Sequence, residues 1–268
     1  MKQKIKSIAI GSFDGIHIAH QKLIQNADAL VIIERNCGSL TAGYRRCLYT
    51  SKICYFYHLD TIKSLSPLEF VQKLNSDFPF LEKIVVGYDF YFGKGKEGDA
   101  QVLEALCNKE VLIIDEICLD NIPVHSRTIK GYIKNGKIES ANRLLGRRYS
   151  IVGDIITGQG LGKKELFATI NLSVEDFEIP REGVYATYTK IDDISYKSVS
   201  FIGHRVTTDG SYAIETHILD NDIDIVSGKI EIEFVSFIRA NQKFDSISEL
   251  KKQITIDIEL AKRVLKTS

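Results

Sequence analysis

The spacing of apolar residues changes near residue 148. In the first half, short apolar runs alternate with stretches in which apolar residues recur every three or four positions. The runs typical of buried strands lie at 5–10, 83–90 and 111–115. Strands that alternate with helices are typical of a parallel sheet, so the first half predicts an α/β domain.

Several segments of this half carry helix signals. The clearest is Ser66-Pro67-Leu68-Glu69, where a capping hydroxyl is followed by a proline and then by a glutamate that can reach back to the cap. The other expected helical stretches are the one marked by Ile18, Leu23, Ala27 and Leu30, then 100–107, 128–134, and 138–145 before Gly146.

From Tyr149 onward, apolar and polar residues alternate with a period of two, which is typical of strands. Such strands are expected at 149–158, 183–191, 197–203, 212–220 and 229–238. Ser246 and Glu249 form a capping-box pattern that begins an amphipathic helix. The second half therefore predicts a compact antiparallel barrel closed by a C-terminal helix, with the domain boundary between 1–148 and 149–268.

Composition narrows the class of function. The chain has 268 residues, 44% of them hydrophobic and 26% charged, and no net charge. A neutral chain argues against a nucleic-acid or membrane-surface partner, which would select clustered Lys and Arg. Neutrality nevertheless hides an asymmetry, since 21 basic and 16 acidic side chains precede residue 149 whereas 14 and 19 follow.

Cysteine usage and hydropathy predict a soluble, cytoplasmic protein. The five cysteines form no C-x-x-C pair, and an odd number suits free thiols in a reducing compartment. No secretory signal segment precedes Gly11, and nowhere do about 18 apolar residues run together, as a membrane span requires. The oligomeric state is not indicated by any heptad or large apolar face.

A strand-to-helix turn at 9–25, AIGSFDGIHIAHQKLIQ, carries the first candidate chemistry. Gly11 and Gly15 permit a tight turn whose backbone N–H groups can face an anion. His17 and His20 lie one helical turn apart and add two donors there, which favours a polyphosphate ligand. Two alternatives are a pair of half-exposed helix histidines and a zinc site, although no cysteine or acid stands at a suitable spacing for zinc.

A second motif favours a different ligand. Gly93-Lys94-Gly95-Lys96-Glu97-Gly98 matches G-x-G-x-x-G and is followed by Asp115, as in a dinucleotide-binding site of a nicotinamide dehydrogenase. The stretch GYDFYF separates the apolar strand from the first glycine, and the loop is charged. A solvated loop is therefore the better interpretation of this isolated match.

The motifs GSFDGIHIAH, VVGYDFYFGKGKEGD, LLGRRY and ETHILD, in this order, resemble the prokaryotic bifunctional riboflavin kinase/FMN adenylyltransferase family. The resemblance runs nearly end to end. It implies a Rossmann-like nucleotidyltransferase domain followed by a riboflavin kinase barrel. It also implies ATP, riboflavin and FMN as substrates, FAD as product and Mg²⁺ as cofactor.

For the adenylyltransferase half, the resemblance implies that His17 and His20 donate to ATP phosphates while FMN phosphate attacks the α-phosphorus directly. The residues implied to surround the nucleotide are Gly11, Ser12, Phe13, Asp14 and Gly15. Those implied to line the flavin cleft are Gly87, Asp89 and Phe90, although at least one phenylalanine of this segment could pack into the core. Ser12 stands where Asn is common, and Ala19 replaces a glycine.

A third motif of this half departs from the family. The family's S-S-T-R-I-R is replaced by residues 125–130, of which Ser126, Arg127 and Lys130 could still meet ATP phosphates. A purely capping Ser126 is an equal alternative. The family's P-H-P segment is also missing and is replaced by RNCGSLTAGYRR.

For the kinase half, the resemblance implies that Glu215 is the base that accepts the proton of the ribityl hydroxyl. Thr169 and Asn171 match the Mg²⁺ and phosphate ligands, and neutral oxygens suit Mg²⁺ that is accompanied by phosphates. The residues implied to contact the nucleotide are Gly160, Gly162, Lys163 and Arg205. Strand-end hydrogen bonding is the structural alternative for Thr169 and Asn171, and an exposed strand glutamate is the alternative for Glu215.

The leading hypothesis is an enzyme that makes FMN from riboflavin and then FAD from FMN. One alternative keeps the kinase alone, because the motif at 125–130 is weakened. The other alternative is a non-catalytic flavin-binding regulator, which the presence of both sets of catalytic residue types opposes.

Overall fold

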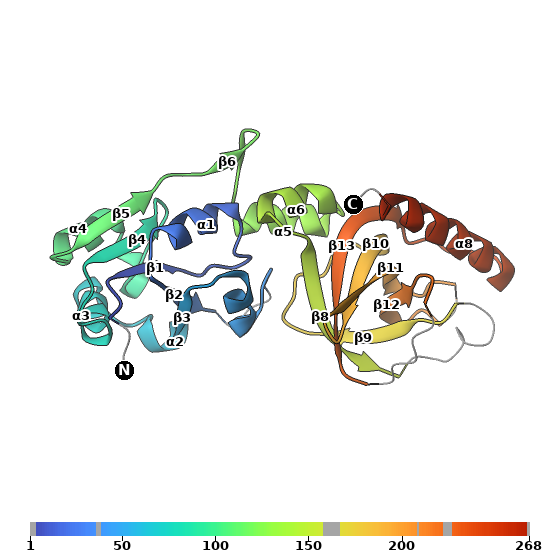
Figure 1. Ribbon diagram of the computed structural model, residues 1–268, viewed down its shortest axis with the longest axis horizontal. Helices are drawn as coiled ribbons and strands as arrows, with labels where there is room; N and C mark the ends of the chain where they lie inside the picture. The colour runs from blue at the N-terminus through green and yellow to red at the C-terminus, as the bar shows by residue number, and fades with distance from the viewer. Residues whose placement is uncertain (1–3, 36–38, 158–166, 208, 222–226, 267–268) are drawn as a thin grey trace. The chain divides into compact units, whose positions relative to one another are not determined.

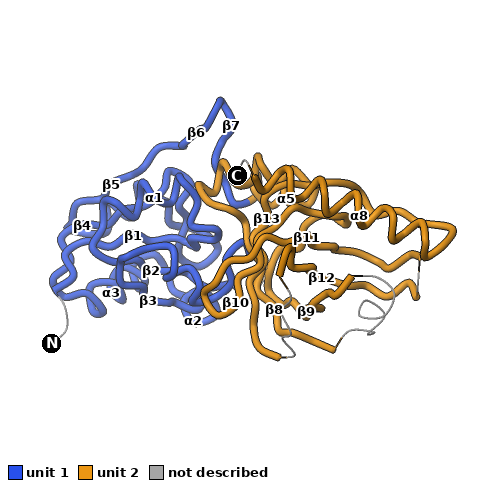
Figure 2. The backbone as a smooth tube through the Cα atoms, turned by 45° about the vertical axis from the view of Figure 1, so that its right-hand side comes forward, with its two compact units in different colours: residues 1–126 blue, residues 127–268 orange. Residues whose placement is uncertain are grey.

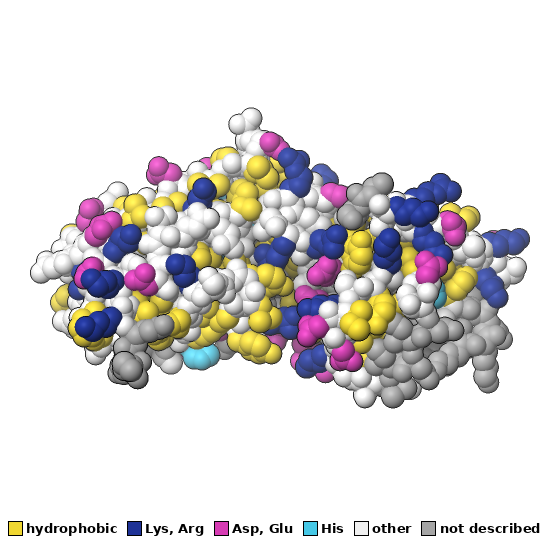
Figure 3. Space-filling model, viewed as in Figure 1, with side chains coloured by type: hydrophobic (Ala, Val, Ile, Leu, Met, Phe, Trp, Pro, Cys, Tyr) yellow, Lys and Arg dark blue, Asp and Glu magenta, His cyan; other side chains and the backbone are white. Residues whose placement is uncertain are grey.

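The computed structural model describes residues 4–35, 39–157, 167–207, 209–221 and 227–266. These residues form two compact units, 1–126 and 127–268, which are described separately (Figure 2). Basic and acidic side chains occur on both units in the face shown in Figure 3. Within the described ranges, no helix is both long and apolar enough to cross a membrane.

The first unit contains a five-stranded parallel sheet in the order β3-β2-β1-β4-β5 (Figure 1). Its strands are β1 (Ser7–Gly11), β2 (Ala29–Glu34), β3 (Ile53–His58), β4 (Lys83–Gly87) and β5 (Glu110–Ile114). Its helices are α1 (Ile18–Gln25), α2 (Leu59–Ile62), α3 (Pro67–Asp77) and α4 (Ala100–Leu106), with short 3₁₀ turns η1 (Gly43–Tyr49) and η2 (Lys94–Lys96). A small hairpin pairs β6 (Cys118–Leu119) with β7 (Ile122–Pro123).

Both faces of this sheet are buried, which explains why its central strands are continuous apolar runs. Ile8 and Ile84 pack on one face with residues of α3 and α4. Ala9, Leu30 and Val85 pack on the other face with residues of α1. The predicted α/β class is therefore confirmed for the first half.

One expectation for this half differs from the structure. The helical spacing was expected to run through Leu30, but α1 ends at Gln25 and Leu30 lies within β2. Apolar residues on a buried strand continued the helical spacing by chance, and Asn26 forms the C-cap where the helix stops. In contrast, the predicted capping box at Ser66 is present, with Ser66 Oγ accepting from Glu69 N and Glu69 accepting from Ser66 N.

The second unit is a closed barrel with the strand order β10-β11-β12-β9-β8-β13. The strands are β8 (Tyr149–Ile156), β9 (Ile170–Val174), β10 (Gly183–Ile191), β11 (Ile194–His204), β12 (Tyr212–Ile218) and β13 (Lys229–Ala240). Strand β9 was not expected, because it is short and precedes no clear turn signal. The remaining strands and the final helix α8 (Ile247–Val264) agree with the predicted barrel.

The barrel interior holds an unusual set of hydroxyl groups. Thr187, Thr189, Ser198, Ser200 and Thr216 are at most 1% exposed and hydrogen-bond to one another at 2.7–3.0 Å. Each buried hydroxyl therefore has a partner, as burial of polar groups requires. Thr216 points inward on β12, so its neighbour Glu215 points to the outer face.

Helices α5 (Ser126–Lys134) and α6 (Ile138–Leu145) connect the sheet to the barrel. Helix α6 packs on β13 and β8, and Asn142 joins it to the barrel by donating to Phe234 O and accepting from Tyr149 N. These contacts explain why the compact division of the chain falls at 126/127, ahead of the functional boundary predicted at 148.

Candidate functional site

The first candidate site lies at the carboxyl edge of the parallel sheet. Strands β1 and β4 are hydrogen-bonded neighbours, and β1 continues to β2 on its other side. The direction of strand order therefore reverses between β1 and β4, where doubly wound folds bind ligands outside the carboxyl ends of the strands. Gly11 ends β1 and Gly87 ends β4, so both predicted loops leave the sheet at this crevice.

The turn after β1 has a strained backbone. Phe13, Gly15 and Ile16 have φ angles of +49°, +91° and +40°, and Ile16 N donates to Phe13 O at 3.1 Å. A positive φ at the β-branched Ile16 is an outlier, and outliers of this kind cluster at ligand-binding sites. Gly15 meets the requirement at no steric cost, whereas Gly11 lies in a strand and is in ordinary contact with the Phe13 ring.

His17 and His20 are brought together as predicted. His17 is the N-cap of α1, and its Nδ1 accepts from His20 N at 3.3 Å. The two rings stack with centroids 3.6 Å apart and planes 15° apart. Because Nδ1 accepts, the proton of a neutral His17 imidazole lies on Nε2, which leaves Nε2–H as the ring donor.

Asp14 has a local structural role in this geometry. Its Oδ1 accepts from Leu40 N at 2.7 Å and Thr41 N at 3.2 Å, while its carbonyl accepts from Ser126 Oγ at 2.7 Å. The carboxylate is buried and joins the β1 turn to the segment that follows β2. These bonds fix Ser126 beside the turn, but they also commit its hydroxyl to the backbone.

The segment that replaces P-H-P is held by two anchors. Asp14 binds its residues 40 and 41, and the buried Arg46 on η1 pairs with Glu34 at the end of β2. Tyr44 and Leu48, which are 73% and 65% exposed, both lie on η1. Residues 39–46 of this replacement segment are therefore tied to both the turn after β1 and β2, while residues 36–38 lie outside the described residues.

The loop after β4 differs from the expected arrangement of aromatic rings. Phe90 is 8% exposed and stacks on Phe92 in the core, with centroids 5.6 Å apart. The structure therefore places Phe90 in core packing, the alternative left open for one phenylalanine of this segment. Tyr88 and Tyr91 are 45% and 56% exposed and are the aromatic side chains that this loop presents to solvent. Asp89 is also exposed.

A polar cluster at the same edge was missed by the sequence. Tyr88 donates to Glu116 Oε1 at 2.7 Å, and His125 Nε2 lies 3.1 Å from the same oxygen. The hydrogen bond to Glu116 raises the pKa of Tyr88 to about 12, and the same bond lowers the pKa of Glu116. The three residues are too far apart in sequence to form a motif, so no pattern could have indicated them.

The remaining motif residues of this half lie outside the geometry described above. Arg127 and Lys130 follow on α5 and belong to the second unit, so they are not part of the geometry described for the first. Residues 93–98 form a loop with the turn η2, closed by a Phe92–Gly98 bridge, and α4 begins only after the cap Asp99. This loop lacks the strand–turn–helix geometry of a dinucleotide fingerprint.

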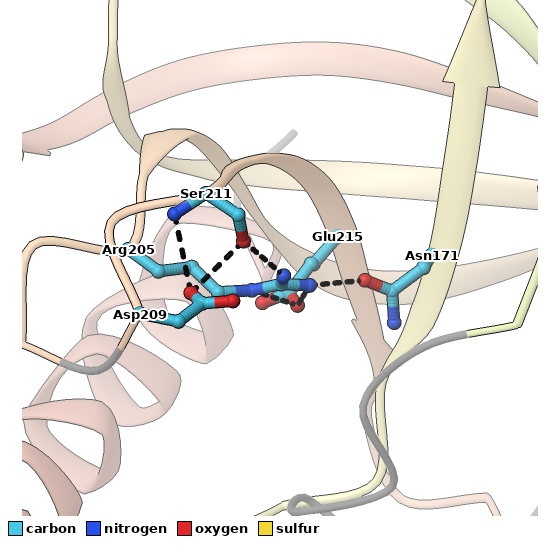
Figure 4. Close-up of polar contacts among 5 residues, drawn as sticks. All are labelled: Asn171, Arg205, Asp209, Ser211 and Glu215. Atoms are coloured by element: carbon cyan, nitrogen blue, oxygen red, sulfur yellow. Dashed lines mark hydrogen bonds and ion pairs between the residues drawn. The ribbon is translucent and has the colours of Figure 1, made fainter.

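The second candidate site lies where β9 and β12 pair. Glu215 and Asn171 are register partners, and Arg205 extends from the end of β11 toward both (Figure 4). Arg205 Nε donates to Glu215 Oε1 at 3.0 Å, and Nη2 donates to the same carboxylate oxygen and to Asn171 Oδ1, the latter at 2.6 Å. The predicted base, one predicted metal ligand and the predicted nucleotide contact therefore form one network.

The network continues into the β11–β12 hairpin. Arg205 Nη1 donates to Ser211 Oγ at 2.8 Å, and Ser211 Oγ donates to Asp209 Oδ1 at 2.9 Å. The hydrogen bond from Ser211 lowers the pKa of Asp209. Sequence reasoning missed Asp209 and Ser211, because short polar residues in a hairpin loop are ordinary turn formers.

The oxygen atoms around Arg205 fit a cation. Asn171 Oδ1 and Glu215 Oε1 converge on the positively charged Nη2 of Arg205. Thr169, two residues before Asn171, is exposed. No group of three or more His, Cys, Asp or Glu side chains suited to a metal occurs in the described part of the chain. A metal here would depend on neutral protein oxygens and substrate phosphates, which Mg²⁺ accepts. Gly160, Gly162 and Lys163 lie outside the described residues.

The barrel unit also has a cavity of about 560 Å³. It is lined by residues from the end of α5, the segment before β10, the start of β12 and the end of β13, among them Arg181, Glu182 and Tyr212. None of the predicted site residues lines it.

The fold and the two sites define a two-domain transferase class in which a Rossmann-like unit precedes an antiparallel barrel. Comparison with known proteins gives the family. The riboflavin kinase family profile matches residues 145–265, and the FAD synthetase profile matches residues 50–128.

Relatives match the chain over nearly its whole length. The bifunctional riboflavin kinase/FMN adenylyltransferase of Buchnera aphidicola from Acyrthosiphon pisum is 30% identical over 96% of this chain and 92% of its own. The protein of the same name from Listeria monocytogenes is 28% identical over 94% of this chain and 90% of its own. The chain belongs to the bifunctional riboflavin kinase/FMN adenylyltransferase family and is a transferase of flavin cofactor biosynthesis.

A solved structure shares the whole fold. A crystal structure described as a macrolide-efflux protein from Streptococcus pneumoniae superposes with a TM-score of 0.86, covering 98% of this chain and 95% of that one. Its sequence is 24% identical, so the likeness shows the fold alone.

Proposed function

We propose that the barrel unit phosphorylates riboflavin with Glu215 as base. The ribityl 5′-hydroxyl oxygen attacks the γ-phosphorus of ATP, the bond from that phosphorus to the β-bridging oxygen breaks, and ADP leaves. The hydroxyl proton passes to the Glu215 carboxylate. The observation that carries this proposal is that Glu215 and Asn171 are partners on neighbouring strands and both accept hydrogen bonds from the Arg205 guanidinium.

Magnesium is part of this proposal. Asn171 and Thr169 would hold it together with the nucleotide phosphates. When bound, Mg²⁺ would offset the negative charge of the phosphate oxygens. Arg205 can supply a planar, two-pronged donor to the same phosphates.

We further propose that the first unit converts FMN to FAD. An FMN phosphate oxygen attacks the α-phosphorus of ATP, and pyrophosphate leaves, so no protein nucleophile is needed. His17, through Nε2–H, and His20 would donate to the nucleotide phosphates at the N-terminus of α1. The backbone of Ser12, Phe13 and Gly15 would approach the nucleotide, and the loop after Gly87 would contact the flavin.

The functional boundary at 148 also remains a proposal. It is supported by the start of the riboflavin kinase match at residue 145 and by the start of β8 at Tyr149. Small-molecule substrates follow from the family. We keep a cytoplasmic location, without nucleic-acid or membrane partners, as a prediction.

A time course separates the two activities. The protein is incubated with Mg²⁺ and excess ATP, starting from riboflavin in one tube and from FMN in the other, and products are resolved by chromatography. FMN followed by FAD in the first tube, and FAD in the second, is expected. No FMN in the first tube would refute the kinase assignment, and no FAD in the second would refute the adenylyltransferase assignment.

A kinase-only enzyme is the second candidate. It is favoured by one observation, the commitment of the Ser126 hydroxyl to the Asp14 carbonyl within an altered motif. This candidate predicts FMN from riboflavin and no FAD in either tube.

A further inference from the structure

We propose that Arg205 is an internal counter-cation of the kinase site, which holds Glu215 and Asn171 in the ligand-free enzyme and must leave both before a metal–nucleotide complex binds. The inference rests on the proposed kinase function, because it concerns the base and the metal ligand of that reaction. It assigns Arg205 a role that precedes any contact with the nucleotide.

One guanidinium, that of Arg205, binds the side-chain oxygen atoms that the proposed reaction requires. Arg205 Nη2 lies 2.6 Å from Asn171 Oδ1, which is the only side-chain oxygen of that residue. Nε and Nη2 both donate to Oε1 of Glu215. Asn171 is 8% exposed, and the side chains of Arg205 and Glu215 are 17% and 20% exposed, so water gives these groups limited access.

The Arg205 guanidinium and a metal ion compete for Asn171 Oδ1. A Mg²⁺ ion bound to Asn171 Oδ1 would lie about 2.1 Å from that oxygen. With Arg205 Nη2 still bonded to the same oxygen, the two cations would be roughly 5 Å apart or less, in a partly dehydrated site where like charges repel strongly. Arg205 must therefore withdraw from Asn171 when the amide oxygen coordinates a metal.

Arg205 also occupies the proposed proton acceptor, Glu215. Oε1 of Glu215 already accepts two N–H groups from Arg205. A hydroxyl approaching this oxygen has to displace them. The same movement of Arg205 thus frees the metal ligand and the acceptor oxygen together.

The β11–β12 hairpin keeps Arg205 anchored after its guanidinium moves. The backbone of Arg205 is held by two hydrogen bonds: Arg205 N donates to Ser211 O at 2.8 Å, and Gly210 N donates to Arg205 O at 3.1 Å. Its Nη1 bonds to Ser211 Oγ, which Asp209 holds from the other side. Nε and Nη2 can therefore turn from the carboxylate to the phosphates while Nη1 keeps its partner, since the guanidinium fork matches both acceptors.

Mn²⁺ binding without nucleotide tests the exclusion directly, because Mn²⁺ accepts the same oxygen ligands and its free ion is quantified by electron paramagnetic resonance. Arg205→Gln is expected to bind Mn²⁺ about tenfold more tightly than the wild-type protein. Adding Asn171→Ala to Arg205→Gln should remove the gain. Arg148→Gln is the matched control, because Arg148 also pairs with a glutamate of the barrel, at 3.4 Å, and should leave Mn²⁺ binding unchanged.

Equal Mn²⁺ affinity in the wild-type protein and Arg205→Gln would overturn the proposal, as would a gain that survives Asn171→Ala. Circular dichroism melts establish that the variants are folded. Should Arg205→Gln not fold, Arg205→Lys replaces it, since a single ammonium cannot keep the forked contacts. A gain of about threefold supports the proposal, and wild-type affinity refutes it.

The measurement uses neither riboflavin nor ATP, so it is separate from turnover. If Arg205→Gln binds Mn²⁺ more tightly but the wild-type protein forms no FMN, the kinase function is refuted and the competition between Arg205 and the metal stands. If the wild-type protein forms FMN but Arg205→Gln binds Mn²⁺ no more tightly, the kinase function stands and the competition is refuted.

Discussion

The two candidate sites are built by different means. The proposed adenylyltransferase site lies within a short segment, where positive φ angles and an N-capping imidazole shape the turn between β1 and α1. The proposed kinase site consists of side chains that meet from different strands of the barrel, with Arg205 bridging Glu215 and Asn171. The first site therefore depends on backbone shape, and the second depends on charge balance between strands.

Replacing the proposed base gives the largest expected effect. Glu215→Gln should lower FMN formation by about 10²–10⁴-fold, the range of general-base catalysis, while FAD formation from supplied FMN continues. Product chromatography from riboflavin and from FMN measures both rates. Glu175→Gln, an exposed glutamate of the same unit, is the control. A variant with undiminished FMN formation would show that the charge at Glu215 is not used.

Removing a proposed phosphate donor from the first unit should have a smaller effect, and it should slow FAD formation instead of FMN formation. His20→Ala is expected to reduce FAD formation by about 10²-fold, as for loss of one preorganised donor, and to leave FMN formation near normal. The same two-substrate assay applies, with the exposed His58→Ala as control. Equal loss of both products would contradict the separation of the two sites.

A backbone substitution tests the dependence of the first site on turn shape. Gly15 has φ +91°, so Gly15→Ala is expected to destabilise the protein by about 1–2 kcal/mol and to slow FAD formation. Gly131→Ala is the contrasting control, since Gly131 lies in α5 with nothing near an added Cβ, and it should stabilise by about 0.5–1 kcal/mol. Denaturant unfolding measures both changes. If the two variants had the same free energy of unfolding, the turn at Gly15 would not be strained by an added Cβ.

The sequence predicted the fold and the local site better than the cross-strand site. Periodicity and capping signals act over a few residues, so they located the barrel strands other than β9, the Ser66 capping box and the facing pair His17 and His20. Leu30 misled because a buried strand can continue a helical spacing.

Contacts between distant residues left no signal in the sequence. The resemblance identified Glu215, Asn171 and Arg205 separately, but their common network depends on the register of β9, a strand that the pattern missed. The carboxylate of Asp14 was grouped with the nucleotide contacts, although it binds backbone amides of the segment after β2. Such partners follow from tertiary structure alone.

The smallest expected effect concerns the polar cluster of Tyr88, Glu116 and His125. Tyr88 donates to Glu116, and this hydrogen bond lowers the pKa of the carboxyl. A lowered carboxyl pKa stabilises the folded protein above the ordinary pKa of Glu, and this stabilisation is lost as the pH falls through the lowered value. Tyr88→Phe should therefore shift the Glu116 pKa upward toward its ordinary value, because the hydrogen bond from Tyr88 is the largest of the interactions that lower it. Carboxyl-detected NMR titration measures this shift, and Tyr91→Phe, at a neighbouring exposed tyrosine, should leave it unchanged. An unaltered Glu116 titration in Tyr88→Phe would mean that His125 alone sets this pKa.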